Sequence, residues 1–333
     1  MSHTNIQKIA IVRLSALGDI INSAVVLQFI KQQYPDAKID WITEEVFSSI
    51  LENHPLINKI YTINLKKIKK SKKISELLSM ISKLKNLDNY DLIIDMQGLI
   101  KSAIVSKIIG KNTHGFDKDS SREGISSLFY NTTSKIAYDE NVIKRNCFVV
   151  ADALGFEITD KMLLDKKPVF KTDKKLNDEK LKIAIVIGAS WKSKKYPKEK
   201  IAMLCDALKK ECVLIWGNKD EKNDALWIAK NSFYAKLAPK FSLGELVSFI
   251  SSVDLVIGND TGPIHIAWAQ NIPSITLFGP TTSRMIYKTP INKYIKSPSK
   301  VDINNINKND FSISEIKVED VVNMAKGLLN NGL

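Results

Sequence analysis

One polar turn in the sequence could hold an anion such as a diphosphate. Residues 255–257 form an apolar run of strand length, and polar residues follow it closely. Asp260 or Thr261 can cap a helix that begins near Pro263, because the fixed φ of proline suits a first helical turn. His265 lies in that turn. A helix start presents unpaired N–H groups and about half a positive charge, so this turn is predicted to bind an anion.

A second polar turn is expected beside the first. Residues 274–278 form the next strand-like run, and residues 279–281 end it with the sequence Gly-Pro-Thr. Ligands of open α/β sheets bind outside the carboxyl ends of the strands. Both turns are therefore expected on the rim where a ligand would lie.

An acidic residue near the start of the chain is a further candidate. Residues 8–12 form an apolar strand, and a helix is predicted over residues 20–34. Gly18 permits close approach of a ligand or of neighbouring backbone, and Asp19 stands at the beginning of the helix. A helix cap is one interpretation of the Asp19 carboxylate, and a chemical role is the other.

Composition limits the class of protein. The chain has 333 residues, of which 44% are hydrophobic, and this indicates a globular protein of two domains. The formal net charge of +13 predicts an acidic partner: nucleic acid, an anionic membrane surface or a phosphorylated substrate. Cys147, Cys205 and Cys212 lack C-x-x-C spacing, so buried reduced thiols and a cytoplasmic location are expected. No apolar run reaches the roughly 18 residues that span a bilayer.

Strands and helices alternate along the chain, and this predicts an α/β fold with doubly wound parallel sheets. Further strands are predicted over residues 39–43, 57–63, 90–95, 182–187 and 213–217. The predicted organisation is a first domain over 1–165, a linker over 166–180, a second domain over 181–311 and a terminal helix over 312–333.

A lysine-rich segment, residues 65–87, holds eight lysines against one acid, Glu76. Its apolar residues recur at helical spacing and predict an amphipathic helix: Ile74, Leu77, Leu78, Ile81 and Leu84. A solvated polar face is one interpretation of the lysines. The other is contact with phosphate or anionic lipid by the densest group, Lys66, Lys67, Lys69, Lys70, Lys72 and Lys73.

Several motifs together resemble the bacterial heptosyltransferases that build the inner core of lipopolysaccharide. They are D-T-G-x-x-H from Asp260, F-G-P-T from Phe278, L-S-A-L-G-D-I from Leu14 and D-x-Q-G-L-x-K-S from Asp95. The resemblance covers nearly the whole chain. It implies a GT-B fold, with two Rossmann-like domains facing a central cleft and the terminal helix packing back on the first domain.

In this family heptose passes from ADP-L-glycero-D-manno-heptose to an acceptor sugar with inversion. The resemblance implies that Asp19 is the general base. The donor-binding residues it implies are Ser190, Lys194, Glu221, Phe241, Asp260, Thr261, Gly262 and His265, all in the second domain. The acceptor-binding residues it implies are Gln97, Lys101 and Arg122. Gly18 and the tract lysines Lys66, Lys67 and Lys69 are expected beside them from the residues themselves, all in the first domain.

No cofactor or metal is expected, because Lys194, Ser190 and the helix start at Thr261 and Gly262 would supply the positive charge. The loop pair Asp117 and Asp119 spells D-x-D but falls outside the donor-like half. A peripheral, monomeric protein on the cytoplasmic face of the inner membrane is expected.

The acceptor implied by the resemblance is the first Kdo of Kdo2-lipid A, and a heptose acceptor is the near alternative. A sugar-nucleotide epimerase of the same fold and a basic nucleic-acid-binding protein are two other classes. No RNP, helix-turn-helix or zinc-finger spacing supports nucleic acid as a partner.

Overall fold

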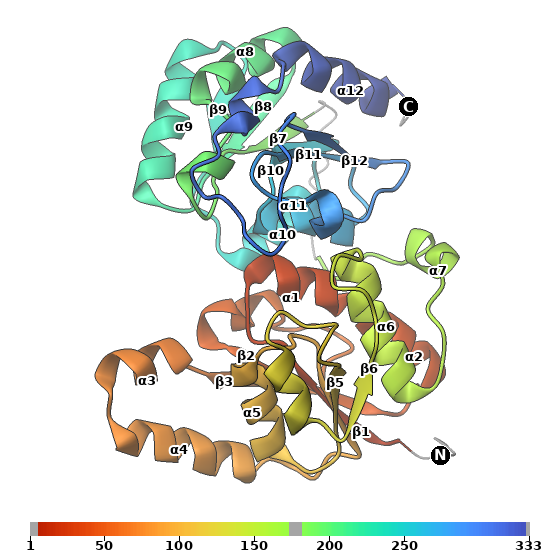
Figure 1. Ribbon diagram of the computed structural model, residues 1–333. Coiled ribbons are helices and arrows are strands. Elements are labelled where there is room, and N and C mark those ends of the chain that lie inside the picture. Colours follow the sequence, from red (N-terminus) through yellow and green to blue (C-terminus); the bar gives the residue numbers. More distant parts are fainter. Residues whose placement is uncertain (1–5, 173–181, 331–333) are drawn as a thin grey trace. The chain divides into compact units, whose positions relative to one another are not determined.

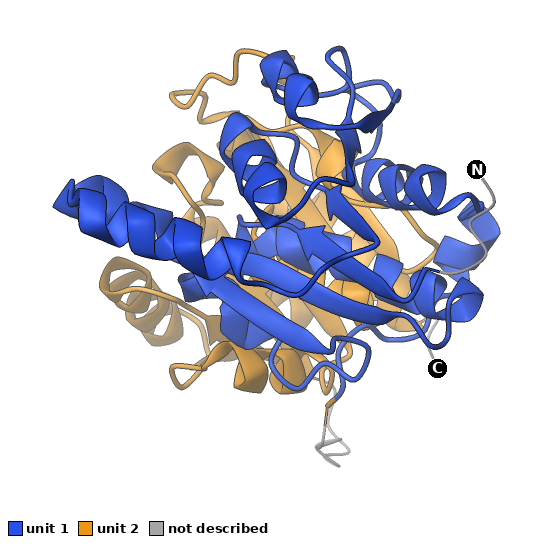
Figure 2. Ribbon diagram, turned by 90° about the horizontal axis from the view of Figure 1, so that it is seen from below, with its two compact units in different colours: residues 1–171 blue, residues 172–333 orange. Residues whose placement is uncertain are grey.

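Parallel strand pairing builds two six-stranded sheets in the computed structural model (Figure 1). The structure describes residues 6–172 and 182–330. Two units divide the chain, residues 1–171 and residues 172–333, and each contains one sheet (Figure 2). The predicted doubly wound α/β class is confirmed.

Unit 1 has the strand order β3-β2-β1-β4-β5-β6. Its strands are β1 (Lys8–Val12), β2 (Lys38–Glu44), β3 (Lys59–Ile63), β4 (Leu92–Asp95), β5 (Thr113–Phe116) and β6 (Thr132–Ser134). Its helices are α1 (Leu17–Ala24), α2 (Val26–Gln33), η1 (Glu45–Ile50), α3 (Leu65–Ser71), α4 (Ile74–Lys85), α5 (Ile100–Ile109), η2 (Gly124–Phe129), α6 (Val142–Leu154) and α7 (Asp160–Leu164). Strand β1 is central and apolar because helices cover both faces of a parallel sheet.

Unit 2 repeats this order as β12-β11-β10-β7-β8-β9. Its strands are β7 (Lys182–Val186), β8 (Glu211–Ile215), β9 (Ala235–Leu237), β10 (Leu255–Asn259), β11 (Ser274–Phe278) and β12 (Asn292–Lys296). Its helices are η3 (Lys192–Lys194), α8 (Lys198–Leu208), α9 (Lys219–Asn231), α10 (Leu243–Ile250), α11 (Gly262–Ala269), η4 (Ser283–Met285), η5 (Ser312–Glu315) and α12 (Val318–Asn330).

The strand order fixes where ligands can bind. In unit 1 the chain turns from one side of the sheet to the other between β1 and β4, and in unit 2 between β7 and β10. Loops leave the carboxyl ends of two adjacent strands in opposite directions at such a point and open a crevice. Asp19 and Gln97 follow these strands in unit 1, and Lys194 and Asp260 follow them in unit 2.

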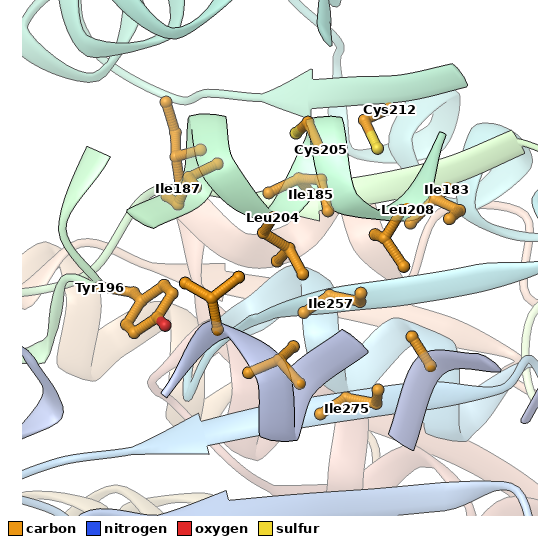
Figure 3. Packing of buried hydrophobic residues seen from close by; sticks show 14 of the residues in the cluster. Ile183, Ile185, Ile187, Tyr196, Leu204, Cys205, Leu208, Cys212, Ile257 and Ile275 are labelled. Carbon is orange, nitrogen blue, oxygen red and sulfur yellow. The ribbon is translucent and has the colours of Figure 1, made fainter. Parts of the chain in front are cut away.

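The terminal helix packs in unit 2, whereas the family resemblance implied packing on the first domain. Val321 and Ala325 of α12 are fully buried and belong to one apolar cluster with residues of α8 and the second sheet. Figure 3 shows Leu204 and Leu208 of α8 packed with Ile257 and Ile275 in this cluster. The helical spacing of α12 predicted its buried face, but spacing does not specify the partner.

Residues 166–171 belong to unit 1, so the linker predicted over 166–180 is wrong for this part. Lys166 is buried, and burial lowers its pKa to about 7. The ring of Phe170 packs edge-on against His54 at 5.9 Å between centroids, and the backbone N–H of Lys167 donates to Gln28 Oε1 at 2.9 Å. The predicted linker residues 173–180 lie outside the described residues.

The lysine-rich segment folds as two helices where one was predicted. Lys72 ends α3 in the left-handed conformation with φ of 55°, and α4 begins at Ile74. Leu84 is buried, whereas Ile74, Leu77 and Leu78 are exposed. The amphipathic pattern is therefore present, but only its C-terminal end is covered by the core. None of the described helices is both long and apolar enough to cross a membrane.

We expect Val321→Ala to lower the free energy of unfolding by about 2–3 kcal/mol, because it removes buried methyl groups and leaves a cavity. Denaturant unfolding measures this loss, with the exposed Lys326→Ala in the same helix as a control that changes little. Hydrogen exchange should speed up in α8 and β10 but not in β1. Faster exchange in unit 1 instead would contradict the assignment of α12 to unit 2.

Candidate functional site

Asp19 lies at the start of α1, just beyond the carboxyl end of β1, and both its oxygens have partners. Arg13 Nη2 is 3.0 Å from Asp19 Oδ1, and the backbone N–H of Ala16 donates to Oδ2 at 3.1 Å. Arg13 is buried and also donates to the carbonyl of Met96, which follows β4. The guanidinium thus fixes the Asp19 carboxylate between the two central strands. About a quarter of the Asp19 side chain stays exposed, at 27%.

Gln97 and Lys101 reach the same turn from the other side of the switch point. Gln97 Oε1 accepts from the backbone N–H of Leu14 at 2.8 Å and of Ser15 at 3.3 Å. Lys101 Nζ donates to Ser15 Oγ at 3.2 Å. Asp19, Gln97 and Lys101 are therefore brought together around one turn. Gln97 holds that turn in place, and a contact between Gln97 and an acceptor stays a prediction.

Asp95 is a residue of this cluster that sequence reasoning did not assign. It is fully buried, and burial raises the pKa of its carboxyl group against the lowering effect of its hydrogen bonds. Tyr130 Oη and the backbone N–H of Gln97 each donate to it at 2.8 Å. Burial, with the nearby Asp95 charge, raises the pKa of Tyr130. An aspartate at the end of an otherwise apolar strand was the available signal.

Two further predicted acceptor residues, Gly18 and Arg122, lie near this cluster. Gly18 is half-buried in the first turn of α1, and Arg122 is exposed in the loop before η2. The neighbouring Glu123 accepts from the N–H of Ile100 at 2.8 Å, which holds the loop of Arg122 at the start of α5, next to Lys101.

Lys66, Lys67 and Lys69 are exposed on α3. Burial raises the pKa of Glu44, and the charges of Lys101 and Lys66 oppose that shift. Lys66 and Lys101 thus act on the same carboxyl group, whereas the contact of these lysines with an acceptor stays a prediction.

A buried ionic cluster lies at the switch point of unit 2. Lys194 Nζ is 2.9 Å from Asp260 Oδ2, and His265 Nε2 is 3.4 Å from Oδ1. All three side chains are less than 10% exposed. Burial alone would raise the pKa of Asp260, but Lys194 and His265 outweigh it and hold that pKa well below its usual range. Three of the predicted donor residues are thus one interacting group.

Asn259 anchors this cluster and was missed by the sequence analysis. It is fully buried at the end of β10, and its Nδ2 donates to the carbonyls of Ile187 and Gly188, each at 3.2 Å. Its Oδ1 accepts from the N–H of Tyr196 at 3.0 Å. Asn259 therefore joins β10 to the loop after β7, and this loop contains Lys194.

The helix start predicted at the D-T-G turn is present as α11. Thr261 is its N-cap residue and Gly262 its first residue, and both are half-buried. Pro263 occupies the second position, so the first turn loses no hydrogen bond to proline. The first turn of α11 therefore begins next in sequence to Asp260, the acid of the ionic cluster.

A cavity of about 520 Å³ opens beside the same loops. Its lining includes Ser190, Trp191, Lys192 and Lys195 after β7, together with Asn218, Asp220 and Asp224 at the start of α9. Ser190 is exposed there. The lining carries two lysines and two aspartates, and Lys195 Nζ lies 3.7 Å from Asp224 Oδ2.

Glu221 and Phe241 are predicted donor residues whose side chains contact the protein itself. Glu221 is buried; its Oε2 accepts from the N–H of Gly217 and its Oε1 from Asn218 Nδ2, both at 2.7 Å. Phe241 stacks on Phe249 at 4.9 Å between ring centroids. Glu221 fixes the loop after β8, and the contacts of both residues with a nucleotide stay predictions.

Metal ligands are not grouped in the part of the chain that the structure describes: no three His, Cys, Asp or Glu side chains lie together in a way that could hold an ion. Asp117 Oδ1 instead accepts from the backbone N–H groups of Asp119 and Ser120 in a tight turn.

Two doubly wound units, each with a polar cluster at its switch point, define a protein of the GT-B class. The fold agrees with the solved structure of the Escherichia coli heptosyltransferase WaaC with ADP-2-deoxy-2-fluoro heptose, at a TM-score of 0.80 and 24% identity over 96% of this chain and 99% of that one.

The sequence comparisons give the family. The chain is 44% identical to lipopolysaccharide heptosyltransferase 1 of Campylobacter coli over 97% of its own length and 99% of that protein. It is 27% identical to lipopolysaccharide heptosyltransferase 1 of E. coli K12, over 90% of this chain and 96% of that protein. Residues 77–312 match the model of glycosyltransferase family 9 (heptosyltransferase). The chain belongs to this family and is a glycosyltransferase.

We expect Asp260→Asn to destabilise the protein by about 3–5 kcal/mol at pH 7, because it leaves the Lys194 cation buried without its counter-ion. The depressed pKa of Asp260 means that its ionised form stabilises the fold fully above the unfolded pKa of about 3.9. The difference in the free energy of unfolding between this variant and the wild type should therefore shrink as pH falls below about 4.

Denaturant unfolding over a pH series measures this difference. Asp224→Asn is the matched control, since Asp224 is 36% exposed and lies 3.7 Å from Lys195. An exposed pair of this kind contributes about 1 kcal/mol or less. Equal losses in the two variants would contradict the role of the buried cluster.

Proposed function

We propose that the protein transfers L-glycero-D-manno-heptose from ADP-heptose to the first Kdo of Kdo2-lipid A, with inversion, in the synthesis of the lipopolysaccharide inner core. The observation that carries the proposal is the 44% identity to lipopolysaccharide heptosyltransferase 1 of C. coli over nearly the whole chain. The two polar clusters support it with chemistry suited to the two substrates.

Unit 2 would bind the donor. The start of α11 and the ammonium group of Lys194 supply donors for the diphosphate as it leaves. Asp260 already compensates the charge of Lys194, so the exposed Lys192 of the cavity lining and the start of α11 would offset the additional negative charge. Ser190 would contact phosphate in that cavity. Asp260 and His265 would orient the lysine and the donor sugar.

Unit 1 would bind the acceptor and supply the base. Asp19 takes the proton of the acceptor hydroxyl as the oxygen attacks the anomeric carbon, and ADP leaves from the opposite face. Arg13 positions the carboxylate without closing it off, because part of Asp19 stays exposed. Lys101 and Arg122 are placed at the start of α5 and would contact the carboxylates of Kdo.

The proposed location is the cytoplasmic face of the inner membrane, with the protein bound peripherally through its basic first unit and acting as a monomer. A heptose acceptor is the near alternative, because the donor and the chemistry would be the same. A sugar-nucleotide epimerase would instead change the donor without an acceptor, and no specific observation favours it.

We expect heptose transfer from ADP-heptose to Kdo2-lipid A in a panel of acceptors that includes the heptosylated product. Mass spectrometry of the acceptor and release of ADP measure the reaction. Transfer to the heptosylated acceptor alone would assign the protein to the next step. Conversion of ADP-heptose without any acceptor would favour an epimerase.

We expect Asp19→Asn to reduce turnover about 10²–10⁴-fold while ADP-heptose affinity stays unchanged, since the side-chain shape is kept but proton acceptance is lost. Single-turnover kinetics and donor titration separate the two quantities. Asp139→Asn at an exposed site is the control. Near-native turnover with a loss of stability of about 1 kcal/mol would leave Asp19 as a helix cap only.

A further inference from the structure

The hairpin formed by α3 and α4, residues 65–85, contributes little to the core of unit 1. None of the residues of α3 is buried, and Leu84 is the single buried residue of α4. Figure 1 shows the two helices projecting from the β3 edge of the sheet. An open groove of about 620 Å³ lies between β3, α3 and α4. The hairpin is therefore attached to the unit mainly at its base.

The tip of the hairpin exposes a continuous apolar surface. Ile74 is 73% exposed, Leu77 is 40% exposed and Leu78 is 59% exposed. Residues at i, i+3 and i+4 lie on one face of a helix, so these three side chains form one patch. Burying such side chains is favourable and exposing them is not, which indicates a partner for the patch.

Six lysines, at positions 66–73, directly precede this patch, and lysines carry most of the charge of the hairpin. Residues 65–85 contain eight lysines and one acid, Glu76, a net charge of +7. All eight lysines are exposed. Glu76 Oε2 accepts from Ser71 Oγ at 2.8 Å, which ties the start of α4 to the end of α3. The basic end of α3 and the apolar turn of α4 are thus held together at one tip.

We propose that this hairpin docks on an anionic lipid bilayer, with Ile74, Leu77 and Leu78 entering the boundary between headgroups and acyl chains. The lysines then lie at the level of the anionic headgroups. Amphipathic helices with a basic polar face and aliphatic side chains bind membrane surfaces in this way. The inference deepens the proposed function and rests on it for the choice of membrane, but the docking itself needs no transferase activity.

Other occupants fit the hairpin less well. A second copy of the chain would bring two hairpins of charge +7 together, which is unfavourable. Single-stranded nucleic acid is bound by lysines together with stacking aromatic residues, and residues 65–85 contain no aromatic residue. Of these three occupants, only a bilayer uses both the positive charge and the aliphatic patch.

Sedimentation with vesicles of phosphatidylglycerol and phosphatidylethanolamine, without any acceptor, tests the proposal. We expect binding that is lost in phosphatidylcholine vesicles. Lys70→Gln/Lys72→Gln/Lys73→Gln should weaken binding by about 100-fold, at roughly 5-fold per lysine. Ile74→Gln/Leu78→Gln should weaken it by at least about 10-fold. Phe233→Gln, at a side chain of unit 2 that is 91% exposed, should change nothing.

A fluorescent label locates the contact. The three natural cysteines are buried, so a single Leu77→Cys can carry an environment-sensitive dye, with Phe233→Cys as the control site. Emission should rise and shift to the blue with anionic vesicles at Leu77→Cys only. Unchanged emission there, equal effects at both sites, or full binding by Ile74→Gln/Leu78→Gln would each overturn the proposal.

Activity on a soluble, deacylated acceptor separates this proposal from the proposed function. Ile74→Gln/Leu78→Gln should keep the wild-type rate with that acceptor and lose rate with acceptor embedded in vesicles. Equal loss on both acceptors would overturn the docking role. Vesicle binding without transfer to any acceptor would instead contradict the proposed function and leave the docking intact.

Discussion

The buried charge of Asp260 is the constraint on which the candidate site of unit 2 depends. A carboxylate without exposure needs partners of opposite charge or several hydrogen bonds. Its partners come from different parts of the chain: Lys194 from the loop after β7 and His265 from α11. The loops after β7 and β10 must therefore meet, and Asn259 joins them with further hydrogen bonds. The helix start of α11 and the lysines of the cavity are positioned as a result.

Unit 1 has the same topology, but the acidic residues at its switch point have different partners. Asp95 is buried among neutral donors, including Tyr130, and its pKa is raised by burial. Asp19 is partly exposed and paired with Arg13. A buried acid that hydrogen-bonds to its own loops stabilises those loops, whereas a partly exposed, fixed carboxylate stays accessible to a ligand. Asp95 and Asp19 both follow a central strand, so it is their environment, and not their place in the sequence, that distinguishes the two carboxyl groups.

Local pattern predicted the parallel sheets, the helix start at Thr261 and the turn at Asp19, because each depends on residues close in sequence. The anchoring role of Asn259 and the hydrogen bond between Asp95 and Tyr130 were not predicted. Asp95 and Tyr130 are 35 residues apart, and no local motif specifies that they are in contact. The packing of α12 in unit 2 and of residues 166–171 in unit 1 also depends on distant contacts and was not predicted from local pattern. Hydrophobic periodicity and composition indicate which face of a helix is apolar, but tertiary contacts determine which element covers that face.

Helix α4 shows within one element that an apolar pattern does not specify what covers it. Its apolar positions follow a single helical pattern from Ile74 to Leu84, yet Leu84 is 2% exposed and Ile74 is 73% exposed. The core of unit 1 ends near the base of the hairpin, so the same stripe passes from packed to uncovered along the helix. An amphipathic pattern longer than the core beneath it, combined with a net charge of +7, indicates a surface outside the chain as the second partner.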